Sequence, residues 1–98
     1  LIIACFLRMR LARRYFISGR VQGVGFRFFV ERTAAFEGLH GWVRNTADGR
    51  VEIAAEGDRE ALDRFERHLN HGPPAARVEH VDATDCGASG LDTGFSVR

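Results

Sequence analysis

The sequence predicts an α+β sandwich, in which an antiparallel sheet carries two helices on one face. Three observations predict it. Apolar residues alternate along several short segments, they recur at helical spacing in two longer segments, and glycine, proline or an Asp-Gly pair separates the segments. The segments follow the order strand, helix, strand, strand, helix, strand, and a short strand ends the chain. A chain of 98 residues suits one domain with one modest core.

The first strand, loop and helix are predicted from residues 11–38. Residues 11–18 mix aromatic and apolar side chains with polar ones, which is typical of a strand. Residues 19–25 are rich in glycine and predict a loop. From residue 26 to about 37 the apolar residues Phe26, Phe29, Val30 and Ala34 fall at helical spacing, and Gly38 suits the position just past a helix.

Two further strands, a second helix and two short strands follow. Residues 39–45 and 50–56 predict strands joined by a hairpin, because the Asp-Gly pair at 48–49 is a strong hairpin signal. Asp58 can cap a helix that ends before the Gly-Pro-Pro at 72–74. The expected buried stripe of this helix is Leu62, Phe65 and Leu69, and the short strand candidates are 78–82 and 95–97.

This order of elements is the split β-α-β arrangement of ferredoxin-like folds. Many unrelated activities use that fold, so it does not by itself indicate a function. We expect Trp42 to belong to the core and Glu52, Glu56 and Glu60 to form a solvated acidic face. We expect His68 and His71 to be exposed and His40 and His80 to be structural.

The net charge of +1 conceals an asymmetry between the two halves of the chain. Residues 1–50 carry nine arginines against three acids, whereas residues 51–98 carry five arginines against ten acids, and lysine is absent. An anion site in the first half would benefit from this field.

We interpret residues 1–9 as an N-terminal extension and residues 10–98 as the domain; a partly included leader and a gene start set too far upstream are alternatives. The apolar run at 1–7 is too short to span a membrane, and arginines follow it, whereas a secretory signal has its charges first.

Cys5 and Cys86 lie far apart and outside any Cys-x-x-Cys motif. We therefore expect free thiols, no metal site and a cytoplasmic protein.

The loop before the first helix has the chemistry of an anion site. Its sequence is Val21-Gln22-Gly23-Val24-Gly25-Phe26, and Arg27 follows. A helix N-terminus carries unpaired N–H groups and about half a positive charge, and glycines let the backbone direct these groups at one centre. A guanidinium adds a two-point grip on phosphate oxygens. From these residues alone, a plain turn is the alternative. The loop matches neither a Walker A motif nor a dinucleotide fingerprint.

Two motifs resemble those of a known family. Residues 17–27, Ile-Ser-Gly-Arg-Val-Gln-Gly-Val-Gly-Phe-Arg, are similar to the first signature of the acylphosphatases. Residues 41–45, Gly-Trp-Val-Arg-Asn, are similar to the second, with Gly49, Val51 and Gly57 at the expected offsets. The resemblance covers about residues 11–98. It implies a ferredoxin-like fold and hydrolysis of the carboxyl–phosphate anhydride of acyl phosphates, without a metal or other cofactor.

The resemblance also implies a role for each site residue. Arg27 binds the phosphate, Asn45 orients the attacking water, and backbone N–H groups from Val21 to Phe26 complete the cradle. This division of labour is consistent with phosphoryl transfer, which needs positioning and charge neutralisation more than covalent chemistry. We expect a monomer that acts on a small acyl phosphate and that holds phosphate or sulfate in the loop.

Two rival functions are weighed against this one. A ferredoxin-like RNA-binding module is the first, because residues 23–30 loosely echo an aromatic RNA-binding motif. That motif belongs on the third strand of such modules, whereas residues 23–30 lead into a predicted helix, so we expect no nucleic-acid partner. The second rival is an acylphosphatase-like domain of a larger protein that processes carbamoyl phosphate.

Overall fold

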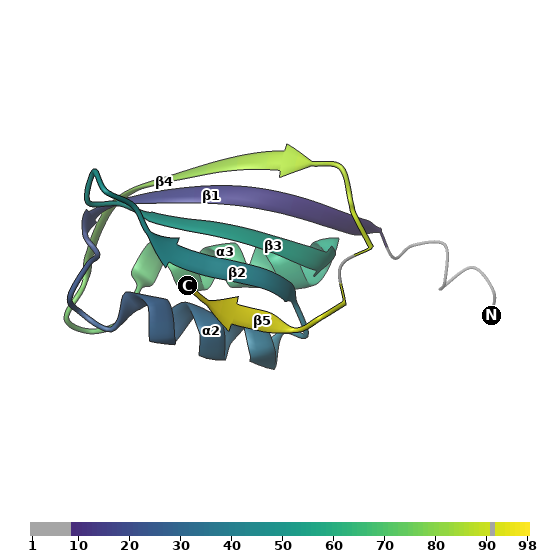
Figure 1. Cartoon of the computed structure of the whole chain (residues 1–98), viewed down its shortest axis with the longest axis horizontal. Helices are drawn as coiled ribbons and strands as arrows, with labels where there is room; N and C mark the ends of the chain where they lie inside the picture. The colour runs from purple at the N-terminus through teal and green to yellow at the C-terminus, as the bar shows by residue number, and fades with distance from the viewer. Residues whose placement is uncertain (1–8, 91) are drawn as a thin grey trace.

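The computed structural model describes residues 9–90 and 92–98, which form a sheet with helices on one face (Figure 1). The elements are β1 (Arg10–Arg20), α2 (Phe26–Phe36), β2 (His40–Asn45), β3 (Val51–Asp58), α3 (Arg59–His71), β4 (Arg77–Cys86) and β5 (Phe95–Val97). The strand order in the sheet is β4-β1-β3-β2-β5. The predicted order of elements and the ferredoxin-like α+β fold are confirmed. The first eight residues of the predicted extension lie outside the described residues.

The sheet is mixed rather than wholly antiparallel. β1 runs antiparallel to β3 and β4, and β2 runs antiparallel to β3, as predicted. β5 is parallel to β2, so the expectation of a purely antiparallel sheet is wrong at this edge. The cause is the connection from β4, which crosses the end of the sheet at which β4 finishes (Figure 1). β5 must then run opposite to β4, and that is the direction of β2.

The core fills the space between the sheet and the two helices. Its buried residues include Tyr15, Ile17, Val43, Val51 and Ile53 from the sheet, Phe26, Val30 and Ala34 from α2, and Leu62, Phe65 and Leu69 from α3. The predicted stripe of α3 is therefore confirmed, and that of α2 is confirmed except at Phe29, which is half-buried. Val21 is also buried, so the loop between β1 and α2 is anchored to the core at both of its ends. This anchoring holds the N-terminus of α2 in place relative to the sheet.

Two strands are longer than predicted. β1 and β4 pair with each other from Ala12 opposite Cys86 to Arg20 opposite Arg77, with an irregularity at Ser18/Gly19. Pairing with β1 extends β4 through residues whose sequence pattern alone does not indicate a strand. This is possible because backbone hydrogen bonds form whatever the side chains are. Gly19 is required at the irregularity, since its φ is 122° and a Cβ there would lie 2.2 Å from the carbonyl oxygen of Arg77.

The two glutamates of β3 are buried, which contradicts the expected solvated face. Glu52 is 4% exposed and Glu56 is 3% exposed, although Glu60 is exposed as expected. Glu56 accepts hydrogen bonds from Arg10 and from the backbone N–H groups of Ser89 and Gly90. On the face of the sheet opposite the helices, arginine side chains and the residues after β4 thus cover these two glutamates. Alternation along a strand cannot reveal that cover.

Several smaller expectations have mixed outcomes. His68 and His71 are exposed, and His40 is structural, because its Nδ1 accepts a hydrogen bond of 2.9 Å from the Gly94 N–H. His80, also expected to be structural, is exposed. Asp58 occupies the predicted N-cap position of α3, but its side chain makes no capping hydrogen bond. Cys86 is a free, exposed thiol. Neither α2 nor α3, the helices in the described part of the chain, is long and apolar enough to cross a membrane.

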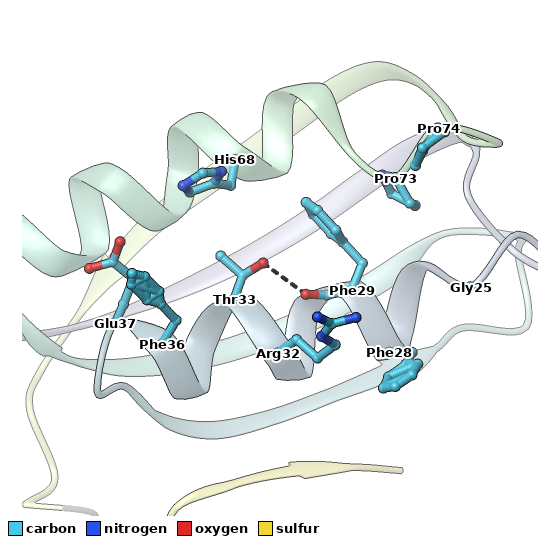
Figure 2. Close-up of a pocket in the computed structure, with 10 residues that line it drawn as sticks. All are labelled: Gly25, Phe28, Phe29, Arg32, Thr33, Phe36, Glu37, His68, Pro73 and Pro74. Carbon is cyan, nitrogen blue, oxygen red and sulfur yellow. Dashed lines mark hydrogen bonds between the residues drawn. The ribbon is translucent and has the colours of Figure 1, made fainter.

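A groove of about 710 Å³ runs between α2 and α3 on the outer surface (Figure 2). Its lining is largely aromatic and proline, with Phe28, Phe29 and Phe36 on α2 and Pro73 and Pro74 beyond the end of α3. Gly25, the residue that precedes α2, lines one end of the groove, so that end adjoins the loop described next (Figure 2).

Candidate active site

The loop before α2 presents backbone N–H groups at a helix N-terminus. Gly25, the N-cap, has φ 78° and ψ 19°, and Gly23 has φ 74°. A Cβ at either position would meet open space, so the left-handed backbone rather than crowding requires glycine. The first hydrogen bond of the helix runs from the Phe29 N–H to the Gly25 carbonyl at 3.0 Å. The N–H groups of Phe26, Arg27 and Phe28 therefore lack the partners of a helix interior.

No acidic residue lies in the first turn of α2, and the N-cap makes no side-chain hydrogen bond. The positive end of this helix is therefore not neutralised by its own first turn. Glu31, one turn further along, lines the cavity described next.

Arg27 and Asn45 meet at one cavity of about 280 Å³, although they come from different elements. Its lining also includes Val21, Gly23, Gly25 and Phe26 from the predicted cradle. The Arg27 Nη1 donates a hydrogen bond of 2.9 Å to the backbone carbonyl oxygen of Arg98. The end of the chain beyond β5 thus orients the guanidinium, which the sequence did not indicate.

The side chain of Asn45 is placed to accept a hydrogen bond. Its Oδ1 is buried and has no partner among the described residues. A buried polar atom of this kind costs about 1–3 kcal/mol unless it is satisfied. At the edge of a cavity, such an atom is poised to interact with a polar ligand.

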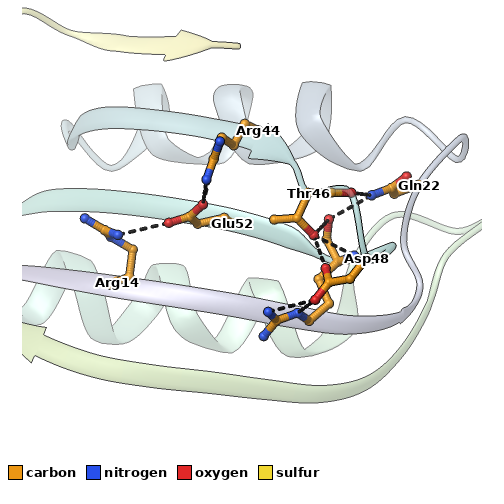
Figure 3. A network of polar contacts seen from close by, with 7 residues as sticks. Arg14, Gln22, Arg44, Thr46, Asp48 and Glu52 are labelled. Carbon is orange, nitrogen blue, oxygen red and sulfur yellow. Dashed lines mark hydrogen bonds and ion pairs between the residues drawn. The ribbon is translucent and has the colours of Figure 1, made fainter.

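The remaining loop residues have structural side chains. Val24 is half-buried and packs against the core, and neither Val24 nor Gln22 lines the cavity. The Gln22 side-chain amide donates to the carbonyl oxygens of Thr46 and Arg50, at 2.8 and 2.9 Å (Figure 3). Gln22 therefore ties the loop to the hairpin turn that follows Asn45. The sequence placed Gln22 in the cradle through its backbone but gave no signal of this contact.

The hairpin turn after Asn45 is held by its own polar contacts (Figure 3). The Thr46 hydroxyl donates to Asp48 and accepts a 3.0 Å hydrogen bond from the Arg50 N–H. Hydrogen bonds from Thr46 and then from Arg50 lower the pKa of Asp48 to about 2. Asp48 is therefore ionised at neutral pH, and it forms an ion pair of 2.9 Å with Arg50 in the turn that follows Asn45.

Trp42 is on the open face of the sheet and not in the core, so that expectation is wrong. Guanidinium groups of Arg14, Arg44 and Arg98 lie over its ring. The residue alternates with the buried Gly41 and Val43 on β2, which places it on the opposite face. A second cavity, of about 580 Å³, opens there and shares Arg27 and Asn45 with the first.

The RNA-binding alternative can be compared with these positions. Residues 26–30 of the RNA-motif echo lie in α2 and not on a strand of the sheet, so the sequence likeness has no counterpart on an RNA-binding sheet face. Within the described residues, no group of three or more His, Cys, Asp or Glu side chains is placed to hold a metal ion.

A sheet covered on one face by helices, with a cavity at a helix N-terminus that has no side-chain cap, defines an α+β protein with a candidate anion site. The acylphosphatase family model matches residues 13–97. An acylphosphatase of Koribacter versatilis is 56% identical over 73 residues, which are 74% of this chain and 66% of that protein. The chain therefore belongs to the acylphosphatase family, a family of hydrolases.

Solved structures are similar over nearly the whole chain. The acylphosphatase from Bacillus subtilis has a TM-score of 0.86 and 43% identity, over 90% of this chain and 98% of that one. HypF from T. kodakarensis has a TM-score of 0.78 and 35% identity, over 90% of this chain but only 12% of that one. The same fold thus occurs both in a small acylphosphatase and inside a much longer chain.

Proposed function

We propose that the chain hydrolyses acyl phosphates to a carboxylate and inorganic phosphate. The observation that carries the proposal is the meeting of Arg27 and Asn45 at one cavity beside the uncapped N-terminus of α2. The backbone N–H groups of residues 21–26 and the Arg27 guanidinium bind the phosphoryl oxygens, which bear the negative charge.

Asn45 positions the attacking water in this mechanism. Its buried amide oxygen accepts a hydrogen bond from the water, and a neutral amide does not repel the phosphate. The water oxygen forms a bond to phosphorus in line with the anhydride oxygen, and the bond from phosphorus to that oxygen breaks. The electron pair leaves with the carboxylate, and a phosphate oxygen takes the proton of the water.

The leaving group makes further machinery unnecessary. A carboxylate departs readily, so the reaction needs neither a metal ion nor a general acid. We accordingly propose a metal-independent enzyme in which residues 10–98 form the catalytic domain. Inorganic phosphate or sulfate competes with the substrate for the loop. The exposed free thiol of Cys86 supports a reducing, cytoplasmic location, and we propose a monomer.

Phosphate release from acetyl phosphate, with and without EDTA, tests this function. We expect turnover that survives the chelator and little turnover of p-nitrophenyl phosphate, whose leaving group is poorer and which the site has no nucleophile to expel. Equal rates on the two substrates, or loss of activity in EDTA that added metal restores, would contradict the proposed mechanism.

A further inference from the structure

A cavity of about 580 Å³ lies on the face of the sheet opposite the helices and shares the lining residues Arg27 and Asn45 with the cavity of about 280 Å³ at the start of α2. Its other lining residues are Arg14, Trp42, Arg44, Glu52 and Arg98. They come from β1, β2, β3 and the residue after β5, so only the folded sheet brings them together.

Glu52 fixes two of these arginines. Its carboxylate is buried, and each of its oxygens accepts a hydrogen bond from a different guanidinium (Figure 3). Arg14 Nη1 lies 2.9 Å from one oxygen, and Arg44 Nε lies 2.7 Å from the other. The two arginine side chains remain about half exposed, at 43% and 52%. A guanidinium carries five N–H groups, so each of these two arginines, which both line the cavity, keeps donors beyond those that contact Glu52.

Trp42 holds the guanidinium groups at its ring. The distances from guanidinium carbon to ring centroid are 4.6 Å for Arg98, 5.4 Å for Arg14 and 5.8 Å for Arg44. Contacts of this kind favour a cation over the face of an indole. The arginines are thereby ordered before any ligand arrives, which lowers the entropy cost of binding.

The charges of the cavity are not balanced from within. Four arginine side chains line it with one carboxylate side chain, a formal side-chain charge of +3, and +2 remains when Arg27 is assigned to the phosphoryl group. Elsewhere on the sheet an arginine is fully compensated: Arg13 lies 2.9 Å from Asp63 and 2.8 Å from Asp85. Like charges gathered around one space repel one another, and a bound anion would remove that repulsion.

We propose that this cavity binds a second anionic group, a carboxylate or a phosphate, beside the phosphoryl group at Arg27. The group has two sources: the far end of the acyl chain of the substrate, or a free small anion. The first source rests on the proposed function. In-line attack places the leaving oxygen opposite the water at Asn45, so an acyl chain must be long and flexible to fold back into the cavity.

The first arm of the test compares adipoyl monophosphate, whose far end is a carboxylate, with hexanoyl phosphate, a neutral chain of the same length. We expect the protein to prefer the charged chain by about tenfold in kcat/KM. Arg14→Gln should abolish that preference and leave hexanoyl phosphate turnover within about twofold. The matched control is Arg32→Gln, which removes a guanidinium that also lies over an aromatic ring, that of Phe28, but lines the groove between α2 and α3; it should keep the preference.

The second arm uses no turnover. Trp42 is the single tryptophan of the chain, so its fluorescence reports directly on this cavity. Inorganic phosphate, titrated at constant ionic strength, should change the fluorescence saturably. The component assigned to the cavity should weaken about tenfold in Arg14→Gln and persist in Arg32→Gln.

A charge preference that depends on Arg14 supports the substrate source, and a fluorescence component that depends on Arg14 supports a free anion. If neither the charge preference nor the fluorescence component depends on Arg14, the proposal is overturned. If no acyl phosphate is hydrolysed, the proposed function fails, and the fluorescence arm still decides on the cavity. Should circular dichroism show that Arg14→Gln is unfolded, Arg44→Gln replaces it, since Glu52 then keeps its contact with Arg14.

Discussion

The two helices of this protein begin in opposite ways. At α3, Asp58 holds the N-cap position, Glu60 lies in the first turn, and the Arg59 N–H donates to the carbonyl oxygen of Met9 at 2.8 Å. At α2, Gly25 is the N-cap, and the first turn contains no acid. The positive end of α3 is thus compensated by the protein itself, whereas that of α2 is left for a ligand.

The surroundings of the two ends differ in the same sense. Asp58, Arg59 and Glu60 are all exposed, so water screens the start of α3. The start of α2 faces a cavity with Arg27 and the amide of Asn45. A helix N-terminus therefore becomes a candidate anion site only where glycines leave its backbone N–H groups exposed and where other elements supply a cation and the lining of a cavity.

Removal of the cation at α2 should have the largest effect. Arg27→Ala should lower kcat/KM by about 10³-fold or more and weaken inhibition by inorganic phosphate, because the guanidinium contacts phosphate oxygens in both substrate and transition state. Arg27→Lys should also fail, since one ammonium cannot reproduce a two-point contact. Steady-state kinetics with acetyl phosphate check both variants, and near-normal activity of Arg27→Lys would argue against bidentate binding.

Asn45→Ala should separate catalysis from binding. We expect kcat to fall by about 10²–10³-fold while the inhibition constant of phosphate stays nearly unchanged, because the water contact matters mainly on the way to the transition state. Circular dichroism should show both Arg27 and Asn45 variants folded. Loss of phosphate affinity as severe as in Arg27→Ala would instead make Asn45 a phosphate ligand.

Two substitutions, one that adds an acid at the start of α2 and one that removes an acid at the start of α3, test the comparison of the two helix ends. Phe28→Glu places an acid in the first turn of α2, at a side chain that is 57% exposed, and should weaken phosphate binding by roughly fivefold. Phe28→Gln separates this charge effect from loss of the ring. Glu60→Gln at α3 should lower the free energy of unfolding by about 0.3–1 kcal/mol and leave phosphate binding unaltered. Equal phosphate affinities in the Glu and Gln variants of Phe28 would show that the dipole end is not the binding element.

The smallest expected effect is the pH dependence of stability that arises from Glu56, which is buried near the end of β3. Burial alone would raise the pKa of Glu56, but hydrogen bonds from Ser89, Arg10 and Gly90 outweigh it and lower the pKa from an ordinary 4.5 to about 2. This contribution to stability is therefore complete above about pH 4.5 and is lost as the pH falls toward 2. In urea unfolding at several pH values, Glu56→Gln should be less stable at pH 7 and should lose less stability between pH 5 and pH 2. An unchanged acid slope would mean that other carboxylates dominate.

Much of the fold and of the candidate site could be predicted from local pattern. Of the residues predicted at helical spacing, Phe26, Val30 and Ala34 in α2 and Leu62, Phe65 and Leu69 in α3 are buried, because helical spacing fixes which residues share a face. Phe29, also predicted, is half-buried. The glycines at 23 and 25 were expected in a loop that bares N–H groups, and their left-handed φ angles require glycine. The roles of Arg27 and Asn45 came from resemblance to a family and stay predictions.

By itself, then, the sequence determined the order of the elements, the two helical faces and the residues of the phosphate loop, since these depend on neighbours along the chain. Only the tertiary structure decided the direction of β5, the Gln22 contact with the hairpin, and the burial of Glu52 and Glu56. It also decided that Trp42 lies under three arginines rather than in the core. Each of these depends on pairs of residues far apart in the chain, and alternation along a strand shows which side a residue faces but not what covers it.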